Sequence, residues 1–287
     1  MPTQQRNVTS ETERDEFIAY HLPALERDEV RHNLLVANLD RLARGLAPNL
    51  RCWTLGAPGA CAVQTPGWPI VLGEIDQGQC RALAETAAAL DYPGVVGPDH
   101  TAPWFAAHAT GLGSTFSEPI PQRIHALHES PVYPGAAGHA RVVDAESADL
   151  YADWTIAFLR EAVPHDPVPS HEWIKQTAAE GHSLLWIVDG EPVSTATVAR
   201  RTRRAAAISR VYTPPHLRGQ GYAGSVTAAL ADCIFAEGRT AACLYSDLRN
   251  PISNRCYARI GFKPVCASWH FPRVPRERPQ ALTSQRA

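Results

Sequence analysis

The sequence lacks the features by which several large classes of protein are identified. It contains no run of about 18 apolar residues, so it predicts no membrane-spanning helix. Residues 1–14 are polar and offer no apolar segment of a signal peptide. The formal net charge is only −2, without the basic excess expected of a general nucleic-acid-binding protein. We therefore expect no membrane partner, no DNA partner and a cytoplasmic location.

The cysteines follow no metal-binding or disulfide pattern. The seven cysteines are odd in number and form no C-x-x-C pair, which favours reduced thiols in a cytoplasmic protein. We expect no bound metal. Apolar residues, in contrast, make up 45% of the 287 positions, enough for the cores of two domains of moderate size.

The most informative stretch is a glycine-rich loop between a strand and a helix. Residues 205–213 are largely small or β-branched, as suits a buried strand, and Pro214 ends them. Apolar residues recur at helical spacing over 225–237. The loop between these elements contains glycines at 219, 221 and 224. Such glycines let successive backbone N–H groups face one point, beside the positive end of the helix dipole, so the stretch predicts a pyrophosphate site.

Two common phosphate motifs do not fit this loop. A mononucleotide P-loop requires a lysine after its glycines, and none follows here. Residues 219–224 match G-x-G-x-x-G by count, but residues 214–218 separate them from the strand, which a dinucleotide-binding turn does not allow.

A second informative segment follows about 30 residues later. Residues 241–247 form another apolar run, and Asn250 and Pro251 suit the first positions of a helix that Gly261 would end. Capping alone would account for these three residues. It does not account for Tyr257.

Together, the two segments resemble the signature segments of the GNAT N-acetyltransferase superfamily in order and spacing. The matching residues are Arg218-x-x-Gly221-x-Ala223 and Asn250-x-x-Ser253-x-x-x-Tyr257-x-x-x-Gly261-Phe262. The resemblance covers about residues 140–271. It implies an α/β fold with a mixed, mostly antiparallel central sheet and flanking helices, and acetyl-CoA or another acyl-CoA as co-substrate.

The resemblance also implies the roles of individual residues. The pantetheine arm of CoA would lie between two splayed strands, where it would pair with the backbone of Val211 and Thr213 and bond to Asn250. A backbone N–H near Val211 would stabilise the oxyanion, and Tyr257 would protonate the leaving thiolate. The implied catalytic residues are therefore Tyr257 and Val211. The implied cofactor-binding residues are Val211, Tyr212, Thr213, Arg218, Gly219, Gln220, Gly221, Tyr222, Ala223, Gly224, Asn250 and Tyr257.

The general base is where the sequence departs from this pattern. Many relatives carry a glutamate on the strand that corresponds to residues 205–210, which contain no carboxylate here. A lysine-like amine is neutral only about once in 10³ molecules at pH 7, so its deprotonation could cost about 4–5 kcal/mol. A water chain, a less basic acceptor or a residue from elsewhere could meet this requirement. The candidate residues are His216, His270, Glu74 and Asp247.

A segment rich in Pro, Gly and Ala at 131–138 predicts the domain junction. We expect an N-terminal domain over 1–137, a catalytic domain over 138–272 and a disordered tail over 273–287. The N-terminal part lacks both motifs. It is either a degenerate copy of the same fold, which would make the protein a tandem, or an accessory extension that shapes the acceptor pocket. Both interpretations predict a single CoA site.

The expected elements alternate in both parts. Helical spacing over 11–46 predicts two helices broken near Pro23. Further elements expected in the first part are strands at 51–55, 61–65, 69–73 and 95–96 and helices at 77–90 and 103–110. In the second part we expect strands at 139–144, 183–188 and 192–200 and helices at 149–162 and 170–179.

We therefore expect an N-acyltransferase that moves an acetyl group from acetyl-CoA to a primary amine of a small molecule. In a first alternative, the acyl group comes from an acyl carrier protein or an aminoacyl-tRNA. Arginines near the expected cofactor entrance would suit an acidic carrier protein as well as CoA phosphates: Arg218, Arg249, Arg255 and Arg259. In a second alternative, the protein binds CoA without turnover and has a regulatory role.

Overall fold

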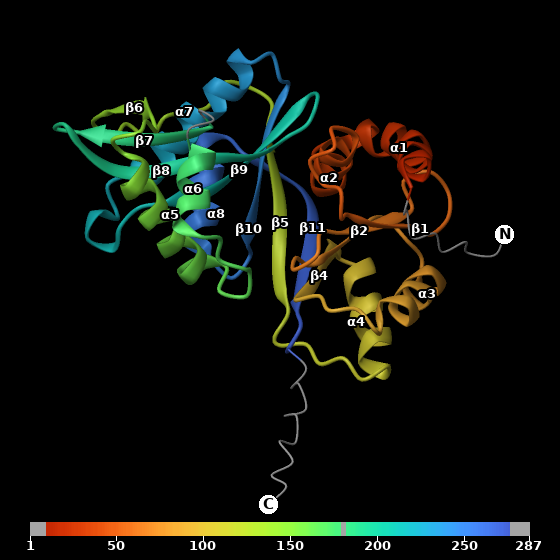
Figure 1. Cartoon of the computed structure of the whole chain (residues 1–287). Coiled ribbons are helices and arrows are strands. Elements are labelled where there is room, and N and C mark those ends of the chain that lie inside the picture. The colour runs from red at the N-terminus through yellow and green to blue at the C-terminus, as the bar shows by residue number, and fades with distance from the viewer. Residues whose placement is uncertain (1–9, 179–181, 276–287) are drawn as a thin grey trace, which may run out of the picture.

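The structure is a computed structural model that describes residues 10–178 and 182–275. Its strands form one open sheet in the order β1-β2-β3-β4-β11-β5-β10-β9-β8-β7-β6 (Figure 1). All pairs of neighbouring strands are antiparallel except β3 with β4 and β9 with β10. The predicted fold class, a mixed and mostly antiparallel sheet with flanking helices, is confirmed.

The strands are β1 (Arg51–Thr54), β2 (Cys61–Gln64), β3 (Ile70–Leu72), β4 (Gly94–Pro98), β5 (Ile120–Leu127), β6 (His139–Val142), β7 (Ser183–Val188), β8 (Glu191–Arg201), β9 (Ala205–Tyr212), β10 (Ala241–Asp247) and β11 (Lys263–Pro272). The helices are α1 (Glu11–Leu25), α2 (Asn33–Ala43), α3 (Gln77–Ala87), α4 (Thr101–Gly111), α5 (Ala148–Ala162), α6 (His171–Ala178), α7 (Tyr222–Ala236) and α8 (Pro251–Ile260), with 3-10 turns η1 (Glu26–Asp28) and η2 (Pro215–Leu217).

The two halves of the sheet repeat one pattern of pairing and exchange a strand. In the first half, the antiparallel run β1-β2-β3 is followed by parallel β4; in the second, β7-β8-β9 is followed by parallel β10. The strand beside β4 is β11, which comes from the end of the second half, and the strand beside β10 is β5, which precedes the predicted junction. The division into domains at 137 and 138 stays a prediction, but the sheet itself is continuous across it.

The helices cover the two faces of the sheet in pairs. One face packs against α1 and α2 in the first half and against α5 and α6 in the second, where Leu185 and Ile187 of β7 meet them. The opposite face packs against α3 and α4 and against α7 and α8, towards which Leu184 and Trp186 of β7 point. Every strand of the central region therefore has one face towards each layer of helices.

Sequence patterns miss two strands and misplace one break. No strand was expected at 120–127 or 263–272, where Pro121, Pro264 and charged residues interrupt the alternation. The two helices expected over 11–46 are present, but the break between them comes a few residues after Pro23, because α1 continues to Leu25 and the chain turns at η1. Pro23 lies in the last turn of α1, where it removes only one intrahelical hydrogen bond. The expected helix end at residue 179 and most of the expected tail, residues 276–287, lie outside the described residues.

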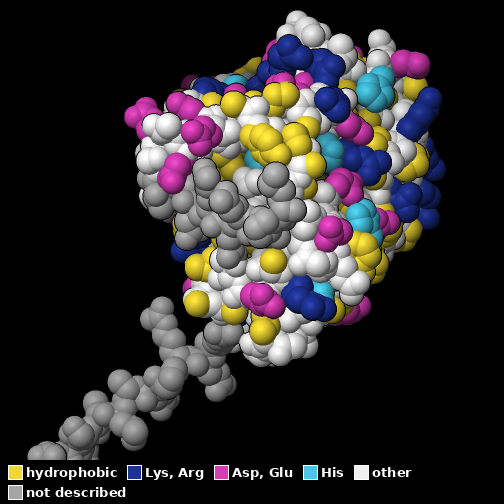
Figure 2. Space-filling view, turned by 90° about the vertical axis from the view of Figure 1, so that its right-hand side faces the viewer, with side chains coloured by type: hydrophobic (Ala, Val, Ile, Leu, Met, Phe, Trp, Pro, Cys, Tyr) yellow, Lys and Arg dark blue, Asp and Glu magenta, His cyan; other side chains and the backbone are white. Residues whose placement is uncertain are grey.

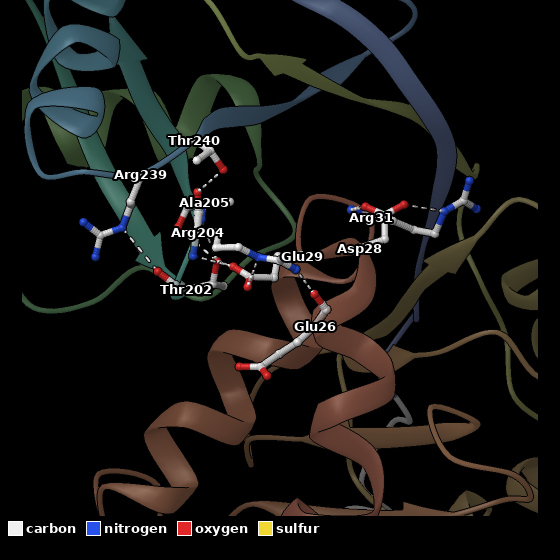
Figure 3. Close-up of polar contacts among 9 residues, drawn as sticks. All are labelled: Glu26, Asp28, Glu29, Arg31, Thr202, Arg204, Ala205, Arg239 and Thr240. Atoms are coloured by element: carbon white, nitrogen blue, oxygen red, sulfur yellow. Dashed lines mark hydrogen bonds and ion pairs between the residues drawn. The ribbon is translucent and has the colours of Figure 1, made fainter.

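A buried carboxylate joins the two halves (Figure 3). Glu29, which is 4% exposed, accepts hydrogen bonds from Thr202 Oγ1 at 2.5 Å and from the backbone N–H and the Nε of Arg204 at 2.7 and 3.0 Å. Arg204 also donates to the backbone carbonyl of Glu26. These contacts hold the segment between η1 and α2 against the β8–β9 turn. Glu29 and Arg204 are 175 residues apart in the chain.

The charge on the outer face of the first half is mixed in sign. Figure 2, which views that end of the molecule, shows acidic and basic side chains interspersed over the visible surface. This agrees with the net charge of −2 and with the absence of a basic stripe on the face shown.

Candidate active site at the carboxyl ends of two parallel strands

The parallel strands β9 and β10 part before they end. Their pairing runs from Ala205 with Ala241 to Ile208 with Leu244, and no further pair joins them in the described chain. β9 continues to Tyr212, and β10 remains paired with β5 as far as Asp247. The backbone of residues 209–212 therefore faces the opening without a strand partner on that side, as a substrate arm that pairs like a strand requires.

A bulge in β9 lies at the same place. Between two register pairs, Thr195 with Tyr212 and Thr197 with Ser209, β9 has one residue more than β8. Arg210 carries the strain, with φ of +52°. A bulge re-aims neighbouring backbone groups, and Val211, whose N–H is the predicted oxyanion donor, is the next residue.

The glycine loop presents a row of free backbone donors. Gly219 and Gly221 adopt the left-handed region, with φ of +85° and +83°, and Gly221 is the N-cap of α7. The first hydrogen bond of the helix runs from Ser225 N to Gly221 O at 3.0 Å. Among the described residues, none accepts a hydrogen bond from the N–H groups of 219–224. Six N–H groups at the N-terminus of a 15-residue helix form a site suited to an anion.

Gly224 is constrained by packing. A Cβ at this position would lie 2.6 Å from Cγ of Pro134, which belongs to the predicted junction segment. The junction therefore packs on the first turn of α7, and only glycine permits this approach.

Two predicted cofactor residues have other partners in the structure. Arg218 donates from Nε to the carbonyl oxygen of Thr213 at 2.9 Å and from Nη2 to Glu161 at 2.7 Å. Its guanidinium also lies over the ring of Tyr212, 5.8 Å from the centroid. The hydroxyl of Thr213 contacts Ser194 Oγ at 2.9 Å. Arg218 thus fixes the strand end and the loop, and its predicted contact with the cofactor stays a prediction.

Helix α8 borders the opening on the α7 face. Asn250 caps it by accepting a hydrogen bond from Ser253 N at 3.1 Å, which leaves the amide N–H₂ of Asn250 for another partner. Tyr257 is half-buried beside Phe262, and no described residue hydrogen-bonds its hydroxyl. Burial raises the pKa of Tyr257, with a smaller contribution from Cys256, so the phenol is a weaker acid than usual.

A hydrogen-bonded chain from β5 supports this end of the sheet. Asn254 donates from Nδ2 to the carbonyl of Asp247 at 3.1 Å, so its Oδ1 accepts the hydroxyl of Ser246 at 2.7 Å. Ser246 Oγ then accepts from Nε2 of His125 at 3.0 Å, which assigns the proton to Nε2 and leaves Nδ1 as an unprotonated atom. Burial and nearby Arg123 lower the pKa of His125, so the ring stays neutral. The exchanged strand β5 thus supplies a wall that sequence patterns did not predict.

The four candidate bases are dispersed. Asp247 is paired with Arg249 at 3.0 Å, and His216 is exposed in η2. His270 lies on β11, one strand beyond β5, where burial lowers its pKa to about 4. Glu74 follows β3, with three strands between β3 and β10, and is paired with Arg31 and His100. The structure does not bring these four residues together.

The loop between α5 and α6 contains a carboxylate, Asp166, that the sequence patterns did not single out. Glu161, at the end of α5, holds Arg218 beside the glycine loop, and His165 lies close enough to His270 on β11 to lower the pKa of that residue. The loop therefore crosses the ends of the strands between β9 and β11. Asp166 lies in this crossing, and burial raises its pKa to about 6, with His165 acting in the opposite direction. It is the only acid in residues 163–170, a signal that was present in the sequence.

A cavity of about 270 Å³ lies at the carboxyl ends of β3 and β4. These are the equivalents of β9 and β10 in the first half. The connection from β3 to α3 is short and contains no glycine-rich loop, so it offers no comparable row of donors. Charged residues at the cavity include Arg31, Glu74 and Asp99. In the described part of the chain, no group of His, Cys, Asp and Glu side chains could hold a metal ion.

Comparisons with known proteins agree with this architecture. Residues 147–262 match the family model described as "Acetyltransferase (GNAT) family". The chain is similar in structure to a Drosophila protein, at 15% identity and a TM-score of 0.69, over 94% of this chain and 98% of that one. It is also similar to a GCN5-related N-acetyltransferase from Kribbella flavida (22% identity, TM-score 0.55, 84% and 94% covered) and to a GNAT-family acetyltransferase from Colwellia psychrerythraea (11%, 0.53, 85% and 96%).

At these identities the solved structures show a shared fold. No protein with a curated description matches the chain. None of the described helices is both long and apolar enough to cross a membrane.

Proposed function

We propose that this chain, a member of the acetyltransferase (GNAT) family through its residues 147–262, is an acyl-CoA-dependent N-acyltransferase that transfers acetyl to a primary amine of a small molecule. The observation that carries the proposal is the row of free N–H groups at 219–224, placed beside the opening between β9 and β10. A pyrophosphate with an extended arm fits both features at once. We further propose a cytoplasmic location, which suits the seven free cysteines.

The residues of this chain would divide the work of acyl transfer. A thioester supplies an activated carbonyl when CoA is bound. The N–H groups of 219–224 would hold the pyrophosphate, and the backbone N–H of Val211 would donate to the carbonyl oxygen as it becomes negative. One such donor typically stabilises the transition state by about 3 kcal/mol. The amide of Asn250 would hold the pantetheine arm.

Two residues would move protons. The hydroxyl of Tyr257 would donate to the leaving sulfur, and Asp166, in the loop that crosses the opening, would accept the proton of the amine. A carboxylate with a pKa of about 6 is a stronger base than an ordinary aspartate and is still ionised at pH 7. The raised pKa of Tyr257 makes its proton transfer harder, so we expect Tyr257 to assist the reaction without being indispensable.

The test is a calorimetric titration of the full chain with acetyl-CoA, longer acyl-CoAs and free CoA. The proposal expects one molecule bound per chain with a micromolar Kd. No binding would overturn it in favour of a donor attached to a carrier protein or a tRNA.

Turnover, measured as thiol release from acetyl-CoA with a panel of small amines, separates an enzyme from a regulatory protein. An enzyme should release thiol, and Tyr257→Phe should lower kcat with an unchanged Kd for acetyl-CoA. Tight binding of acetyl-CoA without turnover on any amine would favour the regulatory alternative.

A further inference from the structure

Arg210 places a cation on the face of β9 opposite the glycine loop. Val211 packs into the core that α7 covers, whereas the guanidinium of Arg210 lies beside the hydroxyl of Tyr151, on α5. The two side chains thus leave the bulge towards different layers of helices. The backbone of Arg210 has φ of +52°, a conformation that costs a non-glycine residue of the order of 1–3 kcal/mol and that often marks a functional site.

The Arg210 side chain lies beside hydroxyl groups, and the structure, over the residues it describes, gives it no ion pair with a carboxylate. Tyr151 is fully buried, and its hydroxyl contacts Thr197 Oγ1 at 2.8 Å, which in turn contacts Ser183 Oγ at 3.1 Å. Burial raises the pKa of Tyr151, but Arg210 and the hydroxyl contacts outweigh it, so the net pKa is lowered. These groups hold the guanidinium in place without neutralising it.

Three other arginines of this strand pair and loop have acid partners, whereas Arg200 is held by Asn33 Oδ1 at 3.0 Å and by the ring of Tyr245. Arg201 is paired with Glu237, Arg204 with Glu29 and Arg218 with Glu161. Arg210 is half-buried, and no acid within the described residues forms an ion pair with it. A partly buried cation is normally neutralised by an anion, and the guanidinium fork matches carboxylate and phosphate groups.

The anion is not readily supplied by the cofactor. The donors proposed for its pyrophosphate, residues 219–224, lead into α7, which covers the opposite face of the sheet. The face of Arg210 is that of α5 and α6, whose connecting loop contains Asp166. An amine that reaches the bulge from this face would approach on the side where Arg210 lies.

We propose that Arg210, held by Tyr151, binds an anionic group of the acyl acceptor, so that the substrate is an amine that also carries a carboxylate or a phosphate. The inference rests on the proposed function and narrows its acceptor class. An amino acid or an aminoalkyl phosphate would place its anion on the guanidinium and its amine at the opening between β9 and β10. Arg210 is then a specificity-determining residue near the end of β9, a strand that contains no carboxylate.

The test compares amines matched in size, with amino acids set against their carboxamides and phosphoethanolamine against ethanolamine. Thiol release from acetyl-CoA gives kcat/KM for each, and we expect the anionic member to exceed its neutral partner by roughly 10- to 100-fold, as for a hydrogen-bonded charge. The first set probes carboxylate and the second phosphate. Calorimetry with acetyl-CoA and with the acetylated form of the best acceptor supplies readouts that do not depend on turnover.

Two variants and one control complete the design. Arg210→Gln should abolish the preference and weaken binding of the acetylated anionic product by a similar factor, whereas Arg210→Lys should retain part of both. Arg203→Gln removes an exposed arginine of the adjacent turn and should change neither. Urea denaturation shows whether each variant is folded.

Each contrary result has a distinct meaning. Equal or better turnover of the neutral amines by the unmodified protein would overturn the inference while leaving the proposed function intact. A fall in acetyl-CoA affinity in Arg210→Gln that matches the fall in kcat/KM would overturn it too, because Arg210 would then bind the cofactor. Binding of acetyl-CoA without turnover of any amine would overturn the small-amine acceptor and the inference together.

Discussion

Glu29 and Arg204 join the two halves of the molecule through a charged hydrogen bond of 3.0 Å, with Glu29 buried and Arg204 half-exposed (Figure 3). The same carboxylate accepts two further hydrogen bonds, from Thr202 and from the Arg204 backbone. The Glu29 carboxylate therefore forms more than an ion pair with Arg204, because it also accepts hydrogen bonds from a side chain and a backbone N–H of the β8–β9 turn.

Glu29→Gln should lower the free energy of unfolding by roughly 2 kcal/mol, because hydrogen bonds to a charged acceptor are lost and the new amide N–H₂ faces donors. Urea denaturation of the full chain measures this. Glu26→Gln is the matched control, since Glu26 contacts Arg204 only through its backbone carbonyl. Equal stability of both variants would show that the contact contributes nothing to the joint.

The carboxylate of Glu29 also predicts a dependence on pH. Burial raises the pKa of Glu29. The hydrogen bonds from Thr202 and Arg204 and the charge of Arg204 lower it by a larger amount, so the net shift is downward. The stabilisation is thus present above the ordinary glutamate pKa and lost as pH falls through the lowered one. Glu29→Gln should reduce the loss of stability that accompanies acidification, measured by urea denaturation over this pH range.

Gly221→Ala should weaken acetyl-CoA binding by more than its cost in stability explains. A left-handed φ costs a residue with a Cβ about 1 kcal/mol, and a return to negative φ would turn the adjacent N–H groups away from their common point. Gly238→Ala, with φ of +82° at the far end of α7, imposes a similar strain away from the loop. Calorimetry should show a loss of affinity of at least about tenfold for Gly221→Ala alone; a similar loss in both variants would assign the effect to strain.

The pH profile of kcat/KM tests Asp166. A base with a pKa of about 6 is protonated below that pH, so kcat/KM should fall as pH decreases through 6. Asp166→Asn should lower kcat/KM at pH 7 and remove this acidic limb, with acetyl-CoA affinity unchanged. Persistence of the limb with the same midpoint in the variant would assign it to another group.

His21 predicts an acid-sensitive contribution in the first half. It is fully buried, accepts a hydrogen bond at Nδ1 from Gly59 N at 3.1 Å, and contacts Thr54 Oγ1 from Nε2 at 3.0 Å. Burial lowers its pKa from 6.5 to about 4. The unfolded chain therefore binds the proton first on acidification, and stability of the order of 3 kcal/mol should be present above pH 6.5 and lost as the pH falls towards 4. Urea denaturation of His21→Gln should show a smaller loss over this window; an identical pH dependence would exclude His21 as its source.

Sequence patterns predicted the elements whose burial is regular along the chain. β7, β8, β9 and β10 each contain an unbroken run of at least four buried residues, and α8 is marked by its own caps, Asn250 and Gly261. The strands that were missed, β5 and β11, owe their structure to partners far away in the chain: Leu127 pairs with Ala242 and Phe271 with Val95. Local periodicity does not contain such pairings.

The site shows the same division. The glycine loop was predicted because conformational freedom and exposed N–H groups are properties of a local segment. Asp166, Arg210 and Tyr151 were not, because their significance depends on neighbours from other elements: a loop that crosses the strands, a bulge set by register with β8, and a hydroxyl from α5. The absence of a carboxylate on the β9 strand was visible, but the arginine there acquires meaning only from its unpaired state.

The strand exchange also has a consequence for synthesis on the ribosome. Among the described strands, β5 pairs with β10 and β11, both of which are translated more than a hundred residues after it. The newly made first half would therefore carry an unpaired strand, and β4 an open edge, until residues 263–272 emerge. Open strand edges invite pairing with other chains. Neighbouring nascent chains of this protein would be natural competitors for those edges.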